Sequence, residues 1–295
     1  MADTLYGVDV SKWQGTIDWP KVKDSGKVDF VITKIGSGRL SSQKDKTFET
    51  NYTSAKRIGI PIGGYWYSYA MSADEAVKEA NACLECIKGK QFEYPIYFDI
   101  EEEKQLRLGR SAVSKMIKAF CDTLEAAGYF VGVYTSKSHF DSYVDNECRT
   151  KYTSWVAHYG VAKTTYTGPY DMWQKSDKGK IDGISGNVDL DECYRDFPSI
   201  IKKLGKNGFT KTEETTTAES IKPETLKPAP TESLTKVEII CHSLNVRTGP
   251  SLSSKAVDIA RNGEVYVLDK EQNGWGRIKE KNLWISIKPH YVKKI

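Results

Sequence analysis

The amino-acid sequence predicts an α/β fold, in which strands and helices form a closed barrel, followed by a small all-β domain. Over residues 1–207, apolar runs rich in β-branched residues alternate with segments of helical periodicity. Residues 208–235 are rich in Thr, Glu, Pro and Lys and nearly lack large apolar side chains. Residues 236–295 return to the alternation of apolar and polar residues that is typical of strands. A chain of 295 residues can hold one large and one small domain of this kind.

Eight strand-like runs and four helical patterns follow one another in the first 207 residues. The strands are expected within residues 5–11, 28–36, 61–70, 94–101, 130–136, 152–160, 170–177 and 184–192. The helices are expected within residues 18–26, 47–59, 73–89 and 111–128. Repeated strand–helix units predict a parallel sheet, and eight strands in so short a chain predict that the sheet closes. Because the helical patterns fade in the second half, we expect a modified TIM-like (β/α) barrel with reduced late helices.

The polar segment of residues 208–235 is interpreted as a flexible linker, because it cannot bury enough apolar surface to offset its ordering entropy. The expected domains are therefore residues 1–207 and residues 236–295. The second domain holds 11 Lys and Arg against 6 Asp and Glu, a net charge of +5. This charge suits an anionic partner such as a bacterial wall polymer, a membrane or a nucleic acid, although ordinary surface charge explains it as well.

Composition also bears on where the protein is made. The chain has no apolar run of about 18 residues, so no transmembrane helix or membrane insertion is expected. The stretch "MADTLYGVDV" lacks a basic region followed by an apolar one, so no signal peptide is expected. Six scattered cysteines, among which only Cys83 and Cys86 form a CxxC pair, are expected to be free thiols. Free thiols fit synthesis in a reducing cytoplasm.

Acidic residues stand at the ends of three predicted strands. Asp9 ends the first strand, Asp99 and Glu101 end the fourth, and Asp189 ends the eighth. In a closed barrel, the eighth strand neighbours the first, and the fourth lies across the mouth, where active sites are found. Asp99 and Glu101 are two residues apart and point to the same side of their strand. We therefore expect the four carboxylates to converge on one pocket.

Carboxylates on two sides of a cleft suit the cleavage of a glycosidic bond. One carboxyl group donates a proton to the leaving oxygen, and an ionised one supports the oxocarbenium-like transition state. Mutual repulsion raises the pKa of one member, which keeps a proton available near neutral pH. Acids can also be helix caps or surface residues, and this is the favoured interpretation for Glu102 and Glu103.

Two other kinds of site are alternative interpretations of the acidic, cysteine and histidine residues. Four acids could hold Ca²⁺ or Mg²⁺, but no acidic loop has ligand spacing and the four histidines are dispersed. Cys148 and His158 are close in sequence, as in a cysteine peptidase, but no nucleophile signature surrounds them. We therefore expect neither a metal nor another cofactor.

Aromatic residues near the same strand ends support a sugar substrate. Tyr65 and Tyr67 share one face of the third strand, Tyr134 lies in the fifth and Trp173 in the seventh. Flat rings with polar edges stack on sugar C–H faces while their OH or NH groups form hydrogen bonds, although core packing is the alternative. Lys34 would be an unpaired buried charge unless it pairs with one of the acids.

These segments together resemble a known family. "GVDVSKWQG", "FVITKIGSG", "GGYWYSYA", "YFDIE", "GVYTS", "WVAHYG" and "MWQKSDKGKIDGISGNVDLD" are similar, in this order, to glycoside hydrolase family 25. The resemblance covers residues 4 to about 200. It implies a lysozyme, or N-acetylmuramidase, that hydrolyses the β-1,4 bond between N-acetylmuramic acid and N-acetylglucosamine in peptidoglycan.

The resemblance also implies roles for the four acids. Glu101 would be the general acid/base, and Asp99 would orient the substrate's own acetamido group as the nucleophile, with retention of configuration. Asp9 and Asp189 would bind substrate and tune the other two. A nucleophilic enzyme carboxylate remains the alternative. Many members have an acid after the lysine of the second strand, where this chain has Ser37.

The last 60 residues resemble a bacterial SH3 domain, most specifically in "LNVRTGP" at residues 244–250. In wall hydrolases such domains bind the cell wall, so a wall peptide or an anionic polymer is the expected partner rather than nucleic acid. The residues expected to line its pocket are Trp275, Trp284 and Tyr291. A structural appendage is the alternative.

A glycosidase with a wall-binding domain, free thiols and no expected signal peptide suggests a phage or prophage endolysin. Such a protein would accumulate in the cytoplasm and reach the wall of Gram-positive cells through a holin-dependent membrane hole. The alternatives are a bacterial autolysin of the same activity and a non-catalytic wall-binding protein on a degenerate barrel.

Overall fold

The computed structural model describes residues 4–211, 234–240, 243–251, 254–261, 263–272, 274–288 and 291–295. One unit comprises Thr4–Lys211, and the described residues from 234 onward belong to a second unit. Residues 208–211, expected to be linker, belong to the first unit and contact its other residues. The carbonyl of Gly208 accepts a hydrogen bond of 3.1 Å from Gln91 Nε2, and Lys56 Nζ lies 5.8 Å from the Phe209 ring centroid. Residues 212–233 of the expected linker lie outside the described residues.

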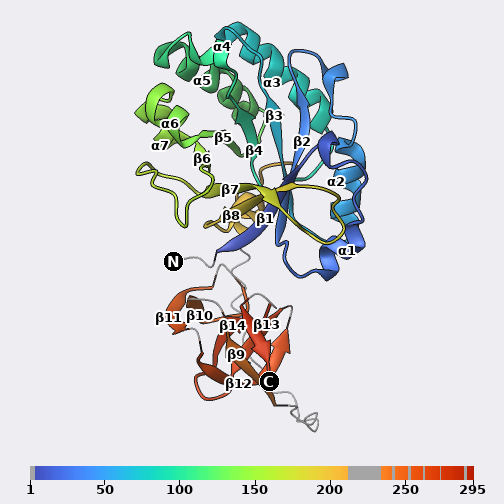
Figure 1. The fold of residues 1–295 in the computed structure, drawn as a ribbon, viewed down its shortest axis with the longest axis vertical. Helices are drawn as coiled ribbons and strands as arrows, with labels where there is room; N and C mark the ends of the chain where they lie inside the picture. Colours follow the sequence, from blue (N-terminus) through green and yellow to red (C-terminus); the bar gives the residue numbers. More distant parts are fainter. Residues whose placement is uncertain are drawn as a thin grey trace. The chain divides into compact units, whose positions relative to one another are not determined.

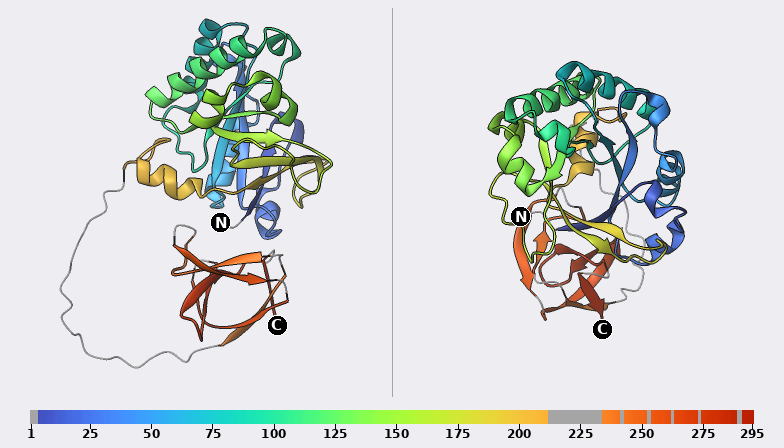
Figure 2. Two further views of the ribbon diagram at one scale, coloured as in Figure 1. Left: turned by 90° about the vertical axis from the view of Figure 1, so that its left-hand side faces the viewer. Right: turned by 45° about the horizontal axis from the view of Figure 1, so that its top comes forward.

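Eight strands close into a barrel in sequence order (Figures 1 and 2). They are β1 (Leu5–Val10), β2 (Phe30–Ser37), β3 (Ile62–Tyr67), β4 (Ile96–Asp99), β5 (Val131–Ser136), β6 (Thr153–Ala157), β7 (Met172–Gly179) and β8 (Val188–Cys193). Neighbours from β1 to β7 run parallel. The prediction of a closed eight-stranded barrel is confirmed.

Helices cover the first six strands far more than the last two (Figure 1). They are α1 (Trp19–Asp24), α2 (Phe48–Arg57), α3 (Ala73–Ile87), α4 (Glu103–Leu106), α5 (Arg110–Ala126), α6 (Lys137–Tyr143), α7 (Asn146–Lys151) and α8 (Phe197–Leu204). The described stretch from β6 to β8 contains no helix, so the expected reduction of the late helices is confirmed. Within the described ranges, no helix has the length and apolar character needed to cross a membrane.

The long helices α3 and α5 form because their apolar residues recur on one face and because α3 has a strong N-cap. Ser72 Oγ accepts a hydrogen bond of 3.2 Å from Glu75 N at the start of α3. Both helices bury their apolar faces, and Phe120 of α5 stacks on Phe98 of β4 at 4.3 Å between ring centroids. The outward residues of the strands therefore form a core with the helices.

Strand β8 runs opposite to the direction that a regular (β/α) barrel requires. It pairs antiparallel with both β7 and β1, because a hairpin rather than a crossover helix joins it to β7. Asp189 consequently lies at the start of β8, not at its end as expected. The reversal nevertheless brings the start of β8 to the C-terminal end of the parallel strands, where Asp189 pairs in register with Asp9.

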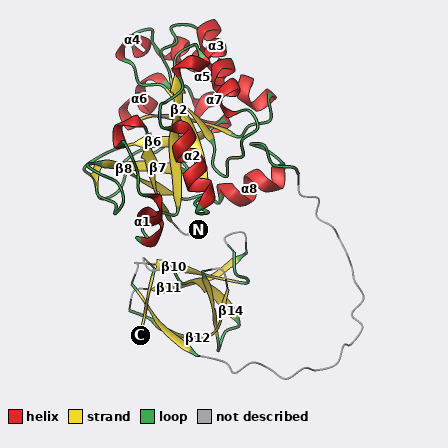
Figure 3. Ribbon diagram, turned by 90° about the vertical axis from the view of Figure 1, so that its right-hand side faces the viewer, coloured by secondary structure: helices red, strands yellow, loops and turns green. Residues whose placement is uncertain are grey.

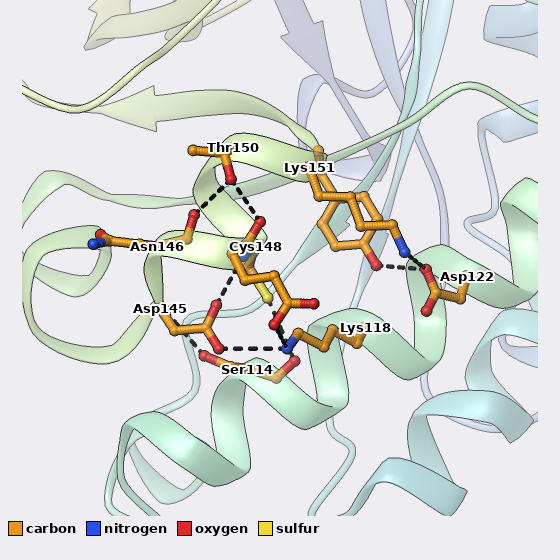
Figure 4. Close-up of polar contacts among 10 residues, drawn as sticks. Ser114, Lys118, Asp122, Asp145, Asn146, Cys148, Thr150 and Lys151 are labelled. Carbon is orange, nitrogen blue, oxygen red and sulfur yellow. Dashed lines mark hydrogen bonds and ion pairs between the residues drawn. The ribbon is translucent and has the colours of Figure 1, made fainter.

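Helix α7 is attached to α5 through a set of polar contacts (Figure 4). Asp145 caps α7 by accepting a hydrogen bond of 2.8 Å from Cys148 N. The backbone N–H of Asp145 donates to Ser114 Oγ at 3.0 Å, and Lys118 Nζ lies 3.6 Å from Asp145 Oδ2. This attachment fixes the connection between β5 and β6.

Helix α8 lies against the N-terminal end of the barrel (Figure 2, left; Figure 3). Phe197 packs edge-on against Tyr94 and Phe130. After the helix, Asn207 adopts a left-handed conformation with φ of 54° and is fully buried. Its Oδ1 accepts a hydrogen bond of 2.6 Å from Phe130 N, and its Nδ2 donates to the carbonyls of Phe92 (3.1 Å) and Tyr94 (2.9 Å). One side chain therefore joins the segments that lead into β4 and β5.

The second unit is all-β, as expected. Its strands are β9 (Thr235–Ile239), β10 (Ser243–Arg247), β11 (Ala256–Arg261), β12 (Val265–Gln272), β13 (Trp275–Ile278), β14 (Leu283–Ser286) and β15 (Val292–Lys294). They form one sheet in the order β11-β10-β14-β13-β12-β9-β15. Val237, Leu268 and Ile285 belong to its buried core.

Asn207→Ala should lower the free energy of unfolding of the barrel by about 3 kcal/mol, because it leaves one buried donor and two buried acceptors without partners. Chemical denaturation of residues 1–211 would measure this change. Asn187→Ala is the matched control, since Asn187 is exposed and its backbone carbonyl, not its side chain, accepts a hydrogen bond from Gln14. Equal stabilities of the two variants would contradict the assignment of a structural role to Asn207.

Candidate functional site

A cavity of about 260 Å³ lies at the C-terminal end of the parallel strands. It is lined by Asp9, Trp13, Lys34, Tyr65, Tyr67, Asp99, Glu101, Tyr134, Trp155, Tyr159, Gln174 and Asp189. The four carboxylates expected from the sequence thus share one cavity. Asp9 and Asp189 come from β1 and β8, whereas Asp99 and Glu101 come from the end of β4, so acids approach from two sides.

On the first side, Asp9 is held in a network of polar groups. Gln174 Nε2 donates a hydrogen bond of 2.6 Å to Asp9 Oδ2. Gln174 Oε1 in turn accepts hydrogen bonds from the hydroxyl groups of Tyr134, at 2.6 Å, and Tyr159. Because each hydroxyl donates to the same oxygen, the amide of Gln174 is oriented with its N–H toward Asp9.

A third acid, Asp191, lies behind Asp9 and Asp189. Its Oδ1 accepts a hydrogen bond of 2.9 Å from Trp155 Nε1. Burial, the charge of Asp191 and the charge of Asp189 all raise the pKa of Asp9 well above its usual range. Burial and the nearby Asp177 raise the pKa of Asp189 to about 6. This side of the cavity therefore retains a proton at pH values where isolated aspartates are ionised.

On the second side, Asp99 and Glu101 lie close to Lys34 and Tyr67. Asp99 is 3% exposed, and Glu101 is half-buried. Lys34 Nζ lies 4.4 Å from the centroid of the Tyr67 ring. The Tyr67 hydroxyl donates a hydrogen bond of 2.7 Å to Glu102 Oε1. Glu102, expected to be a surface acid, is thus attached to the wall of the cavity, whereas Glu103 is exposed.

Burial is the main cause of the raised pKa values on this side of the cavity. It raises the pKa of Asp99 well above its usual range, and the charge of Glu101 raises it further. Burial also raises the pKa of Glu101, while the positive charge of Lys34 lowers it. The pair therefore holds one proton to a higher pH than two isolated carboxyl groups would. A group that keeps its proton near neutral pH can act as a general acid.

Aromatic rings form much of the remaining wall. Tyr65, Tyr67 and Tyr134 line the cavity as expected. Trp155 packs against Tyr134 at 4.4 Å between ring centroids. Trp13 is 79% exposed at the rim, on a short 3-10 turn that Ser11 caps. Exposed and half-buried rings at a polar cavity are suited to stack on the C–H faces of a sugar.

Trp173, expected to bind substrate, does not line the cavity. Its indole N–H donates a hydrogen bond of 2.8 Å to the carbonyl of His158. Side chains alternate along a strand, and in β7 the inward residues are Met172, whose Sδ accepts from the Tyr97 hydroxyl at 3.0 Å, and Gln174. The prediction for Trp173 is therefore wrong by one residue.

Sequence reasoning missed Gln174, Asp191 and Tyr159 as site residues. Gln174 is adjacent to Trp173, so the correct phase of β7 would have selected it. Asp191 is two residues from Asp189, and the same alternation that groups Asp99 with Glu101 could have grouped these two. Tyr159 follows β6 in a loop, where no periodicity predicts the direction of a side chain.

The structure argues against a cysteine nucleophile in this unit. Cys148 is buried, its thiol lies 3.6 Å from the carbonyl of Ser114, and burial raises its pKa to about 12. His158 instead contacts Thr164 through Nδ1 at 3.0 Å. Neither side chain therefore provides a thiolate–imidazole pair. Among the described residues, no three His, Cys, Asp or Glu side chains are grouped so that they could hold a metal ion.

A larger cleft of about 540 Å³ lies at the opposite, N-terminal end of the barrel. Its acids are engaged in ion pairs, since Asp171 Oδ2 lies 3.2 Å from Arg195 Nη1 and Glu125 lies 3.9 Å from Lys151. Paired charges of this kind lack the free acid and base that hydrolysis requires. The smaller cavity with unpaired carboxylates is therefore the better candidate.

In the second unit, the expected wall-binding residues are mostly buried. Trp275, Trp284 and Tyr291 are 9%, 8% and 4% exposed, respectively. A domain this small needs its large apolar side chains to build a core. These three residues therefore contribute to the core of the second unit, and the expectation that they bind the wall stays a prediction.

Comparison with known proteins gives two family matches and several relatives. Residues 8–184 match glycosyl hydrolases family 25, and residues 242–293 match the bacterial SH3 domain. The autolytic lysozyme of Clostridium acetobutylicum is 32% identical over 190 residues, which cover 64% of this chain and 55% of that protein.

Comparison with solved structures also finds lysozymes and autolysins. The modular autolysin LytC of Streptococcus pneumoniae is 31% identical with a TM-score of 0.58, covering 65% of this chain and 47% of that one. The bacterial lysozyme of Streptomyces coelicolor is 28% identical with a TM-score of 0.57, covering 69% and 97%, respectively. This chain thus spans about half the length of the first relative in each comparison. Because the match at residues 8–184 covers more than half of the 295 residues and lies on the barrel that carries the carboxylates, the chain belongs to glycosyl hydrolases family 25.

Proposed function

We propose that this chain is a peptidoglycan hydrolase of the lysozyme type, which cleaves the β-1,4 bond between N-acetylmuramic acid and N-acetylglucosamine. The observation that carries the proposal is the cavity in which Asp9 and Asp189 approach from one side and Asp99 and Glu101 from the other. Two relatives are described as an autolytic lysozyme and an autolysin, and a structure of the latter contains a synthetic peptidoglycan ligand. Family membership and these descriptions support the substrate.

In the proposed mechanism Glu101 is the general acid. It is half-buried, has a raised pKa and lies beyond the end of β4, so it can reach the leaving oxygen of the scissile bond. Once its proton has been transferred, the same carboxylate activates the water that completes hydrolysis.

Asp99 is proposed to orient the 2-acetamido group of the substrate as the internal nucleophile. One of its carboxylate oxygens, Oδ1, is buried and forms no hydrogen bond in the described structure. A buried acceptor of this kind has high affinity for an N–H donor such as an amide. Asp9 and Asp189 would bind the sugar and, through their charges, set the proton affinity of the acids.

A non-catalytic wall-binding protein on the same barrel is the competing function. Such a protein would gain nothing from burying four acids beside one lysine, because each buried carboxyl group costs desolvation energy. The retained carboxylates therefore favour an enzyme.

We further propose that the second unit holds the enzyme on the cell wall. Its charge of +5 supports anionic wall polymers as the ligand, and a wall peptide bound at Trp275, Trp284 and Tyr291 is the alternative. The described residues include five cysteines, all buried and free, which favours synthesis in a reducing compartment, as in a phage or prophage endolysin rather than an autolysin. Lysis of expressing Gram-positive cells only after a holin permeabilises their membrane would support the endolysin.

Glu101→Gln should lower the rate of peptidoglycan hydrolysis by about 10²- to 10⁴-fold, because an amide cannot donate the proton. Turbidity loss of purified walls and thermal melting would be measured together. Glu103→Gln is the matched control, since Glu103 is exposed and forms an ion pair with Arg107, the residue that follows α4. Near-wild-type turnover by folded Glu101→Gln protein would refute the assignment.

Hydrolysis should retain the anomeric configuration without a stable glycosyl-enzyme ester, because the substrate supplies its own nucleophile. The first product observed by proton NMR should be the β-anomer, and a thiazoline analogue of the sugar should inhibit strongly. A sugar ester trapped on Asp99 or Asp189 and detected by mass spectrometry would instead show that an enzyme carboxylate attacks.

The alkaline limb of the pH–rate profile should report the proton on Glu101, because activity falls as pH rises through the pKa of the general acid. The charge of Asp189 raises this pKa and that of Lys34 lowers it. Asp189→Asn should therefore move the midpoint of the limb to lower pH, and Lys34→Met should move it to higher pH. Asp182→Asn, at an exposed site on the β7–β8 hairpin, is the control. Shifts in the same direction would contradict the assignment.

A protein ending at Lys211 should cleave soluble peptidoglycan fragments like the full chain but act about ten- to a hundredfold more slowly on intact walls, where tethering raises the effective concentration. Pull-down of residues 234–295 with purified walls at low and high salt would test the anchor directly. Strong weakening by salt is expected if anionic polymers are the ligand. Full wall lysis by the truncated protein, with no binding by the isolated unit, would exclude anchoring.

A further inference from the structure

A second hollow, of about 690 Å³, opens beside the catalytic cavity. It lies between the loop that follows β2 and the loop that joins β3 to α3. The two depressions meet at a pair of tyrosines, since Tyr67 lines the catalytic cavity and Tyr69 lines the hollow. Their ring centroids are 5.1 Å apart. A ligand bound in the cavity can therefore extend a substituent over this wall into the hollow.

The wall between the two depressions is held in place by buried polar contacts. Glu79 of α3 is fully buried, and its Oε1 accepts a hydrogen bond of 2.8 Å from Tyr69 N. Gln105 Nε2 donates to the carbonyl of Ala70 at 2.8 Å and to Ser68 Oγ at 2.9 Å. These contacts order the wall, and an ordered wall reduces the entropic cost of binding.

A carboxylate also joins the two loops across the hollow. Glu75 Oε2 accepts a hydrogen bond of 2.8 Å from Met71 N, and Glu75 Oε1 lies 2.7 Å from Arg39 Nη1. Arg39 belongs to the loop after β2, and Met71 to the loop after β3. The hollow is therefore formed before any ligand enters.

The side chains of the hollow differ in kind from those of the catalytic cavity. Leu40, Tyr69 and Met71 are 62%, 52% and 43% exposed. Arg39, Lys78 and Glu75 give the hollow a charge of +1, and Lys78 is exposed and forms no ion pair in the described part of the chain. Aliphatic surface with excess positive charge suits a short peptide that has small apolar side chains and carboxylates. Tyr69 is the one aromatic ring among its lining residues, so the hollow offers an uncharged sugar fewer stacking surfaces than the catalytic cavity does.

We propose that this hollow binds the peptide stem carried by the muramic acid residue in the catalytic cavity, with Arg39 and Lys78 attracting the peptide carboxylates. This inference rests on the proposed function, because only a peptidoglycan substrate carries such a peptide on its sugar. The stem would pass over Tyr69, with its aliphatic side chains against Leu40 and Met71. The barrel would then recognise peptide-bearing strands by itself, apart from any contribution of the second unit.

The experiment compares two soluble substrates: glycan strands that keep their stem peptides, and the same strands after an amidase has removed them. The test variant is Lys78→Glu, because Lys78 anchors neither loop. The matched control is Lys23→Glu, an exposed lysine on α1 outside the hollow. Both variants are made in the full chain.

Lys78→Glu should lower kcat/KM on peptide-bearing strands by about three- to tenfold, since it replaces attraction by repulsion at an exposed site. The value on peptide-free strands should not change, and Lys23→Glu should match the wild type on both. The selective loss should shrink in high salt.

Equal losses on both substrates, or no loss on either, would overturn the peptide assignment while leaving the glycosidase intact. If the wild-type protein cleaves neither substrate, the proposed function itself is wrong.

Discussion

The rest of the site depends on one feature. Several carboxyl groups are buried at one end of the barrel, and the residues that line the cavity there include a single lysine. Asp9, Asp99 and Asp191 are each at most 5% exposed, and Lys34 is the one cation that lines the cavity. A buried, ionised carboxylate without a partner is costly, so these groups retain protons instead. The fold must therefore supply enough stability elsewhere to hold them together.

The barrel supplies this stability mainly from the side that its helices cover. The other side, formed by β7 and β8, lacks such a helical layer among the described residues. The packing of α3 and α5 on the early strands and the closure of the base by α8 and Asn207 provide the core. The β7–β8 hairpin replaces helical crossovers, and this replacement reverses β8. The reversal places Asp189 opposite Asp9 in register, so that one pair of strands creates the first half of the acid cluster.

Much of this architecture could be predicted because it follows from periodicity. Eight strands, their order and the inward direction of Tyr65 and Tyr67 follow from alternation within strands. The direction of β8 could not be predicted, because a strand has the same pattern in both directions and only its connection differs. Trp173 was misplaced because β7 does not alternate: apolar Met172 and Trp173 are followed by a run of polar residues, and this order does not show which side chains face inward. The burial of Trp275, Trp284 and Tyr291 could not be predicted, because core and binding aromatics look alike in sequence.

The claim that two opposed carboxylate groups cleave the glycan is tested most directly by mass spectrometry of digested peptidoglycan. Purified walls would be treated with the full chain, and the new reducing ends would be labelled by borohydride reduction. The account predicts fragments whose new reducing end is N-acetylmuramic acid. If the new reducing end is N-acetylglucosamine instead, the enzyme cleaves the other glycosidic bond of the glycan strand. Release of free peptides with intact glycan strands would contradict the account altogether.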